Sequence, residues 1–213
     1  MALINLIFDL DGCLIDSTEV QKTAYYGSYG EIVGDGNCPP FSEYHKHTGD
    51  SLPNIFRKMG LPVEMAGPFR RISSAAVDKV LVNDACIALA RRMKAAGSKI
   101  AICTGKDHYR TVDILKFHHI DDCFDVIVAS DDVAEPKPSA MPVLKSISDL
   151  GVDKDSCILI GDGYNDILSA KAAGVRSVLA LWYCDEGVPR EADYTVASVN
   201  ELAELLEELR NRE

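Results

Sequence analysis

The chain of 213 residues is 47% hydrophobic and carries a formal net charge of −11, which suits a buried core in one or two domains. The negative charge argues against nucleic acid and membranes as partners, because phosphate backbones and anionic lipids attract basic surfaces. The apolar runs are only as long as strands, so we expect no membrane span, and the N-terminus does not resemble a secretory signal. The seven cysteines are scattered and form no C-x-x-C pair, which indicates a cytoplasmic protein without structural zinc.

Short runs rich in Ile, Val and Leu alternate with helical patterns along the chain. The runs cover residues 3–8, 99–103, 125–129, 157–160 and 177–181. Such uninterrupted runs are typical of parallel strands that are covered on both faces. Helical patterns between them end at Gly97, Gly151 and Gly174, and Ser198 with Glu201 has capping-box spacing before a last helix. The alternation predicts an α/β fold with a doubly wound, Rossmann-like parallel sheet and right-handed crossovers.

One segment interrupts this alternation directly after the first strand. Residues 16–81 contain helical patterns and a Gly- and Pro-containing stretch, but no strand signal. We therefore predict two domains. Residues 1–15 and 82–213 form the α/β core, and residues 16–81 form a small helical domain that is inserted into it.

Polar residues follow four of the predicted strands, at the end where open parallel sheets bind their ligands. The first strand ends in Asp9 and Asp11, and the second ends in residues 104–106. The third is followed by residues 130–138, which include a Lys-Pro pair, and the fourth by residues 161–166. One Asp-Gly or Thr-Gly alone is best explained as a solvated turn. Four polar segments at the same edge of a sheet favour a binding site.

The spacing of the first two acids suggests what this site binds. In an extended chain, Asp9 and Asp11 would point to the same side, where two carboxylates repel each other. A hard divalent cation, above all Mg²⁺, would relieve this repulsion, and Asp162 offers it a further carboxylate. Acids, one cation and a nearby lysine suit phosphoryl groups, whose negative charge must be neutralised during transfer.

Four segments of the chain resemble, in order, the four motifs of the haloacid dehalogenase (HAD) superfamily. They are "DLDGCLIDS", "ICTGK", "KPSAMPVL" and "IGDGYNDILSAKAAG", and the resemblance covers essentially the whole chain. The inserted helical segment resembles the cap domain of the phosphoglycolate phosphatase-like branch. It has a weaker resemblance to phosphatases associated with 3-amino-5-hydroxybenzoate synthesis. The resemblance implies a Mg²⁺-dependent phosphatase that hydrolyses a small phosphorylated metabolite.

The resemblance also implies a role for each catalytic residue. Asp9 would attack phosphorus and form an aspartyl-phosphate, and Asp11 would protonate the leaving oxygen and then activate water. Thr104 and Lys137 would hold the phosphoryl group, with Lys137 also offsetting the charge of Asp9. Since superfamily dehalogenases lack an acid at the second position, Asp11 favours phosphate-ester chemistry.

Metal ligands follow from the same motifs. The resemblance implies that Mg²⁺ is bound by the carboxylate of Asp9, the backbone carbonyl of Asp11 and the acid Asp162. Asp166 would be a ligand through water or an orienting group. Because Asp166 also stands where a helix begins, stabilisation of the helix start explains it equally well.

Further residues are expected to contact the substrate. Gly105 and Lys106 follow Thr104 directly. In the superfamily, a Gly-containing loop of the cap closes over the active site and reads the leaving group, which makes His47, Thr48 and Gly49 the candidates here. Phosphoglycolate, sugar phosphates and amino-sugar phosphates all stay open as substrates, and the sequence does not indicate an oligomeric state.

Two other functions remain compatible with these residues. A sugar phosphomutase of the β-phosphoglucomutase type shares all four motifs. A phospho-accepting signalling domain also places acids, a threonine and a lysine around Mg²⁺, but it is much shorter and has no insert that could exclude water. The pattern therefore favours a phosphatase.

Overall fold

The computed structural model describes residues 3–183 and 191–212, and within these ranges a six-stranded parallel sheet forms the core. Its strand order is β5-β4-β1-β6-β7-β8. The strands are β1 (Asn5–Phe8), β4 (Ile100–Cys103), β5 (Val126–Val128), β6 (Cys157–Gly161), β7 (Arg176–Ala180) and β8 (Tyr194–Val196). The predicted α/β fold with a doubly wound parallel sheet is confirmed. Only β8 lacks a predicted counterpart, since its three residues form no apolar run.

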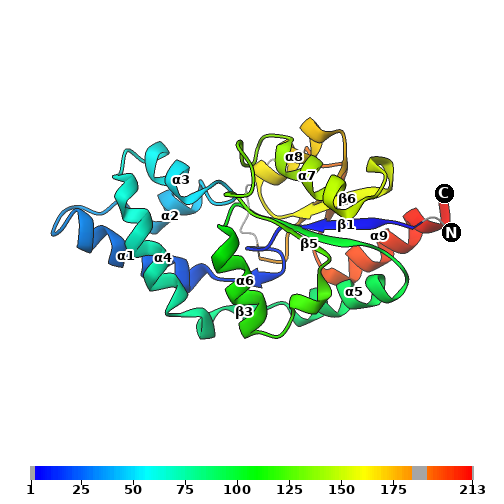
Figure 1. Cartoon of the computed structure of the whole chain (residues 1–213), viewed down its shortest axis with the longest axis horizontal. Coiled ribbons are helices and arrows are strands. Elements are labelled where there is room, and N and C mark those ends of the chain that lie inside the picture. Colours follow the sequence, from blue (N-terminus) through cyan, green and yellow to red (C-terminus); the bar gives the residue numbers. More distant parts are fainter. Residues whose placement is uncertain (1–2, 184–190, 213) are drawn as a thin grey trace.

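Each face of the sheet has its own core, because alternate residues of a strand point to opposite sides. The covering helices are α5 (Asp84–Ala95), α6 (His108–Phe117), α7 (Met141–Leu150), α8 (Tyr164–Ala173) and α9 (Val199–Arg212). Leu6 and Phe8 pack with residues of α5, α6 and α9, whereas Ile7 packs with α7 and α8. Figure 1 shows α7 and α8 above the sheet and the other three helices below it. Burial on both faces explains why the strand sequences are apolar throughout.

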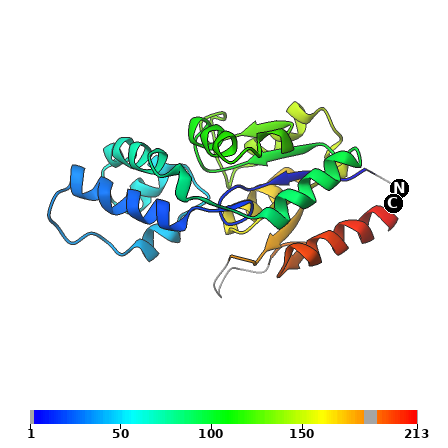
Figure 2. The same ribbon diagram turned by 90° about the horizontal axis from the view of Figure 1, so that it is seen from below.

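A group of helices lies between β2 (Ile15–Asp16) and β3 (Leu81–Val82), two short strands that pair antiparallel. We call residues 17–80 the helical insert. It contains α1 (Thr18–Ile32), α2 (Phe41–His45), α3 (Leu52–Lys58), η1 (Val63–Met65), α4 (Ala66–Ser74) and η2 (Val77–Lys79). Two further 3₁₀ turns, η3 (Asp121–Cys123) and η4 (Lys154–Ser156), lie in the core. Figures 1 and 2 show the insert beyond one end of the sheet, opposite the chain termini.

The helical insert has a hydrophobic core of its own. Tyr25, Tyr44, Phe56 and Phe69 are buried in it, and all members of this cluster come from the insert. The rings of Tyr44 and Phe69 stack with centroids 5.7 Å apart, and Phe56 meets Phe69 edge-on at 6.0 Å. Such aromatic packing lets a few short helices hold a defined shape without contact to the sheet. The division into two domains at residues 16 and 81 stays a prediction.

Within the described residues, no helix is long and apolar enough to cross a membrane. Six of the seven cysteines are free thiols, most of them buried, and Cys184 lies outside the described residues.

Candidate active site

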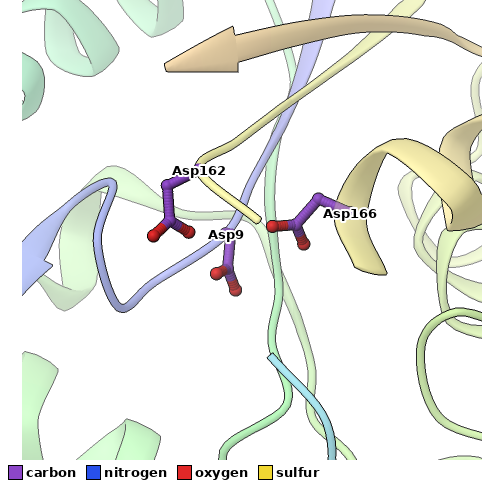
Figure 3. Close-up of side chains that lie close together, drawn as sticks. All are labelled: Asp9, Asp162 and Asp166. Atoms are coloured by element: carbon purple, nitrogen blue, oxygen red, sulfur yellow. The ribbon is translucent and has the colours of Figure 1, made fainter. Parts of the chain in front are cut away.

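Three carboxylates converge at the carboxyl end of the central strands. Asp9 directly follows β1 and exposes only 3% of its surface, and its amide donates a hydrogen bond to the carbonyl of Ile160 at 2.8 Å. Asp162 follows β6, and Asp166 lies in the first turn of α8. Figure 3 shows the three side chains next to one another, with Asp9 between Asp162 and Asp166. One oxygen of each lies within 4.8 Å of the others, close enough for one cation to contact all three.

Close backbone approaches hold two of these acids in place. Gly12 has a φ of +75°, and a Cβ at this position would lie 2.0 Å from Oδ2 of Asp162. Asp162 therefore occupies the space that a side chain at residue 12 would fill. Oδ2 of Asp166 accepts a hydrogen bond from the amide of Gly163 at 3.0 Å, so Asp166 also caps its own helix.

Lys137 lies beneath this group and is almost fully buried, with 1% of its surface exposed. Its Nζ donates hydrogen bonds to Oδ1 of Asp9 at 2.9 Å and to the carbonyl of Cys103 at 3.1 Å, and it also contacts Asp166. One ammonium thus contacts two of the three carboxylates. Burial and the nearby charge of Asp166 raise the pKa of Asp9 to about 7, although Lys137 opposes this shift.

The chemistry of these residues fits a divalent cation. Burial, Asp9 and Asp166 together raise the pKa of Asp162 well above its usual value. This shift reflects negative charge that Lys137 alone does not offset. Hard divalent cations prefer carboxylate oxygens and would compensate this charge.

The carboxylate of Asp11 has different partners and stands apart from the three-acid group. Oδ2 of Asp11 forms an ion pair with Nζ of Lys106 at 2.9 Å, and Oδ1 accepts a hydrogen bond from the Ser17 hydroxyl. Gln21 in turn donates to Oγ of Ser17 at 2.8 Å. Although burial raises the pKa of Asp11, Lys106 and Ser17 outweigh burial and lower it. Each acid of the first motif is thus balanced by its own lysine, Asp9 by Lys137 and Asp11 by Lys106. The resemblance implied the first of these pairs, but sequence reasoning did not foresee the second.

The segment after β4 brings Thr104 to the same edge. Thr104 is buried, its amide donates to the carbonyl of Val128 at 3.0 Å, and its Oγ1 accepts from the amide of Lys106 at 3.2 Å. Gly105 touches the helical insert, because a Cβ there would lie 2.5 Å from the carbonyl oxygen of Gly49. Gly49 also approaches the core on the other side, where its Cβ position is 3.6 Å from Nδ2 of Asn165.

A cleft of about 990 Å³ separates the helical insert from this edge of the sheet. The predicted site residues that line it are Asp9, Asp11, Thr104, Gly105, Lys106 and Asp162 from the core, with His47, Thr48 and Gly49 from the insert. Lys137 and Asp166 do not line the cleft themselves but contact residues that do, Lys137 through Asp9 and Asp166 through the amide of Gly163. Folding therefore gathers all the predicted site residues in and around one cleft.

Some residues of the cleft were missed from sequence. Ser17, Gln21, Tyr44, Arg110 and Asn165 line it as well. Ser17 and Gln21 are one helical turn apart at the start of α1, which is a weak signal that both face the same space. The other three belong to elements whose approach only the fold reveals.

Comparisons with known proteins place the chain in a family. The family described as haloacid dehalogenase-like hydrolase matches residues 6–180. Pyrophosphatase PpaX of Halalkalibacterium halodurans is 30% identical over 97% of this chain and 98% of its own length. Phosphoglycolate phosphatase of Aquifex aeolicus is 28% identical over 95% of this chain and 96% of its own.

Solved structures share the fold. CbbY from Rhodobacter sphaeroides, crystallised with phosphate, superposes with a TM-score of 0.83 at 22% identity, covering 94% of this chain and 96% of its own. A hydrolase from Pseudomonas syringae superposes with a TM-score of 0.83 at 22% identity, covering 96% of this chain and 98% of its own. The matched segment runs from β1 to β7 and includes every core residue of the cleft discussed above. The chain therefore belongs to the haloacid dehalogenase-like hydrolase family, as its four motifs predicted.

Proposed function

We propose that this enzyme is a Mg²⁺-dependent phosphatase that hydrolyses the phosphate monoester of a small cytoplasmic metabolite through an aspartyl-phosphate on Asp9. One observation carries the proposal. Asp9 is held by Lys137, lies within reach of a cation shared with Asp162 and Asp166, and faces a cleft large enough for a metabolite. The curated relatives, which are named as a pyrophosphatase and a phosphoglycolate phosphatase, support the phosphatase activity.

The metal would be held by the carboxylates of Asp9 and Asp162 and by the backbone carbonyl of Asp11, with Asp166 binding through water or orienting the others. When bound, Mg²⁺ neutralises charge on the phosphoryl oxygens during transfer. Because Lys137 already contacts one oxygen of Asp9, it keeps this carboxylate in a fixed orientation toward the cleft.

The residues of the cleft suit a two-step reaction. A carboxylate oxygen of Asp9 attacks phosphorus, and the bond from phosphorus to the ester oxygen breaks. Lys106 keeps the pKa of Asp11 low in the free enzyme, so Asp11 first takes up a proton from solvent as substrate binds, and then gives this proton to the leaving oxygen. Asp11 then takes a proton from water, which attacks the aspartyl-phosphate and releases phosphate and free Asp9. Lys106 lies in the cleft beside Asp11, so an incoming phosphate competes with Asp11 for its ammonium. Thr104 lies at the same edge, and its hydroxyl can donate a hydrogen bond to a phosphoryl oxygen.

Substrate choice is assigned to the helical insert, which we propose acts as a cap. His47, Thr48 and Gly49 line the wall of the cleft that faces the sheet edge, where the leaving group would lie. Phosphoglycolate, sugar phosphates and amino-sugar phosphates are the candidate substrates from the sequence. Amino-sugar phosphates are among them because of the weak resemblance to phosphatases associated with 3-amino-5-hydroxybenzoate synthesis. The relatives named PpaX add pyrophosphate to this panel.

A phosphate-release screen tests the proposal. Purified protein is incubated with p-nitrophenyl phosphate and the candidate metabolites, with Mg²⁺ or with EDTA. We expect many Mg²⁺-dependent turnovers per enzyme and at least a ~10³-fold loss of kcat in Asp9→Asn, since this change removes the nucleophile. Asp16→Asn is the matched control, because Asp16 lines the same cleft outside the three-acid group.

Three outcomes would contradict this function. A wild-type rate in Asp9→Asn removes Asp9 from its assigned role. Interconversion of a sugar phosphate without net phosphate release indicates a phosphomutase. A phospho-Asp9 that persists without turnover indicates a phospho-accepting domain.

A further inference from the structure

A charged cluster outside the three-acid group joins the helical insert to the core. Asp107 stands at the N-cap of α6, and its Oδ2 accepts hydrogen bonds from Nε of Arg70 in α4 and from Nε of Arg110 in α6, both at 2.9 Å. The side chains of Asp107 and Arg110 each expose 7% of their surface, whereas Arg70 exposes 39%. A buried carboxylate is thus shared by one guanidinium of the core and one of the insert.

The two guanidinium groups differ in how firmly they are held. Arg110 lies 5.6 Å from the ring centre of Phe69 and also donates a hydrogen bond to Oγ of Ser73 at 3.3 Å. Its pair with Asp107 lies within one helical turn of α6 and does not need the insert. The Arg70–Asp107 pair does need it, because Arg70 reaches Asp107 only while α4 packs on α6. This pair is therefore an ion pair between the insert and the core that depends on where the insert lies.

Asp107 also borders the catalytic edge. It directly follows Lys106, whose Nζ pairs with Asp11 at 2.9 Å and whose carbonyl accepts from the amide of Ser130 at 3.0 Å. Two residues before it, Gly105 meets the carbonyl of Gly49 from the insert. Four consecutive positions, 104–107, therefore contain a threonine that lines the cleft, the lysine that pairs with Asp11 and two residues that contact the insert.

We propose that Asp107 is a positioning residue that couples closure of the helical insert to the alignment of Lys106 with Asp11. By binding Arg70, it holds α4 against α6, so the loop of residues 47–50 stays over the cleft. The inference rests on the proposed function, in which this cleft binds the phosphorylated substrate. Only the closed arrangement offers the complete site. The apparent Kd for substrate therefore equals the Kd of the closed form divided by the fraction of molecules that are closed.

Arg70→Met tests the coupling, and Arg71→Met is its matched control. Arg71 is the next residue of α4, exposes 63% of its side chain, and pairs with Glu31 of α1 inside the insert. Hydrogen–deuterium exchange is measured in the peptides covering residues 47–51 and 104–107, without substrate. The KM and kcat for p-nitrophenyl phosphate are measured with Mg²⁺ at low and at high salt.

We expect Arg70→Met to exchange several-fold faster in both peptides and to raise KM about 3- to 10-fold with kcat within twofold, as loss of one partly buried ion pair predicts. Arg71→Met should stay within twofold of wild type in every measurement. High salt should move wild type toward Arg70→Met, because screening weakens a partly exposed pair. Since Arg70 makes a single hydrogen bond through Nε, Arg70→Lys should restore most of the lost affinity.

The coupling is overturned if Arg70→Met and Arg71→Met show the same exchange in both peptides, or if KM rises without faster exchange. Failure of the proposed function has a separate signature. In that case wild type releases no phosphate with Mg²⁺, and the exchange comparison still decides whether Asp107 holds the insert in place.

Discussion

Replacing Gly12 by alanine displaces the carboxylate of Asp162 without removing it. A Cβ at Gly12 would lie 2.0 Å from Oδ2 of Asp162, whereas real Cβ contacts stay above 3.0 Å. The carboxylate must therefore retreat by about 1 Å, away from the position it shares with Asp9 and Asp166. A shift of this size beside a metal or a reacting group costs roughly 10- to 100-fold in affinity or rate.

The control for this change is Gly151→Ala. Gly151 has a φ of +65°, close to the +75° of Gly12, but no atom lies within 4 Å of its Cβ position. An alanine in the left-handed backbone conformation destabilises the folded state by about 1–2 kcal/mol, so both variants should have a lower melting temperature than wild type. In a Mg²⁺ titration of phosphate release, only Gly12→Ala should raise the concentration for half-maximal activity 10- to 100-fold. If it needs no more Mg²⁺ than Gly151→Ala, the assignment of Asp162 to the metal is refuted.

Three further predictions concern charge. Lys137→Met should lower the free energy of unfolding by about 3–5 kcal/mol, because two buried carboxylates lose their shared ammonium; unchanged stability in urea would contradict that geometry. Mg²⁺ at 100 times its Kd should stabilise wild type and Asp16→Asn by about 2.7 kcal/mol, but not Asp162→Asn, and thermal denaturation with and without EDTA measures this difference. Although burial raises the pKa of Asp107, two guanidinium groups hold it below its usual value of 3.8. Its contribution is therefore complete above the usual pKa and is lost as the pH falls through the lower pKa of the folded state. In urea titrations, the difference in unfolding free energy between wild type and Arg70→Met should stay constant from pH 5 to about pH 4 and narrow at lower pH.

Local sequence was enough to predict the core. The run at residues 99–103 became β4 (Ile100–Cys103), and the helical pattern that stops at Gly174 became α8. Both elements could be predicted because the spacing of apolar residues within a few positions differs between a buried strand and a helix with one buried face. Strand β8 was not predicted, because only Val196 of its three residues is buried and so short a segment shows no apolar pattern.

The acids at the strand ends were also visible in the sequence, since parallel strands bring their carboxyl ends to one edge. The resemblance also implied that Lys137 offsets the charge of Asp9. Nothing in the sequence indicated that Lys106 pairs with Asp11, or that Arg70 of the insert reaches Asp107 of the core.

The sequence by itself thus determined which elements form and which chemistry gathers at the sheet edge, because both are read from local patterns and from the common direction of the strands. Only the tertiary structure showed that the carboxylate of Asp11 forms an ion pair with Lys106 and lies outside the group of Asp9, Asp162 and Asp166. It also decided that the loop of residues 47–50 meets Gly105. The physical reason is that ion pairing and backbone contact depend on distances of a few ångströms between segments far apart in the chain, and no local pattern encodes those distances.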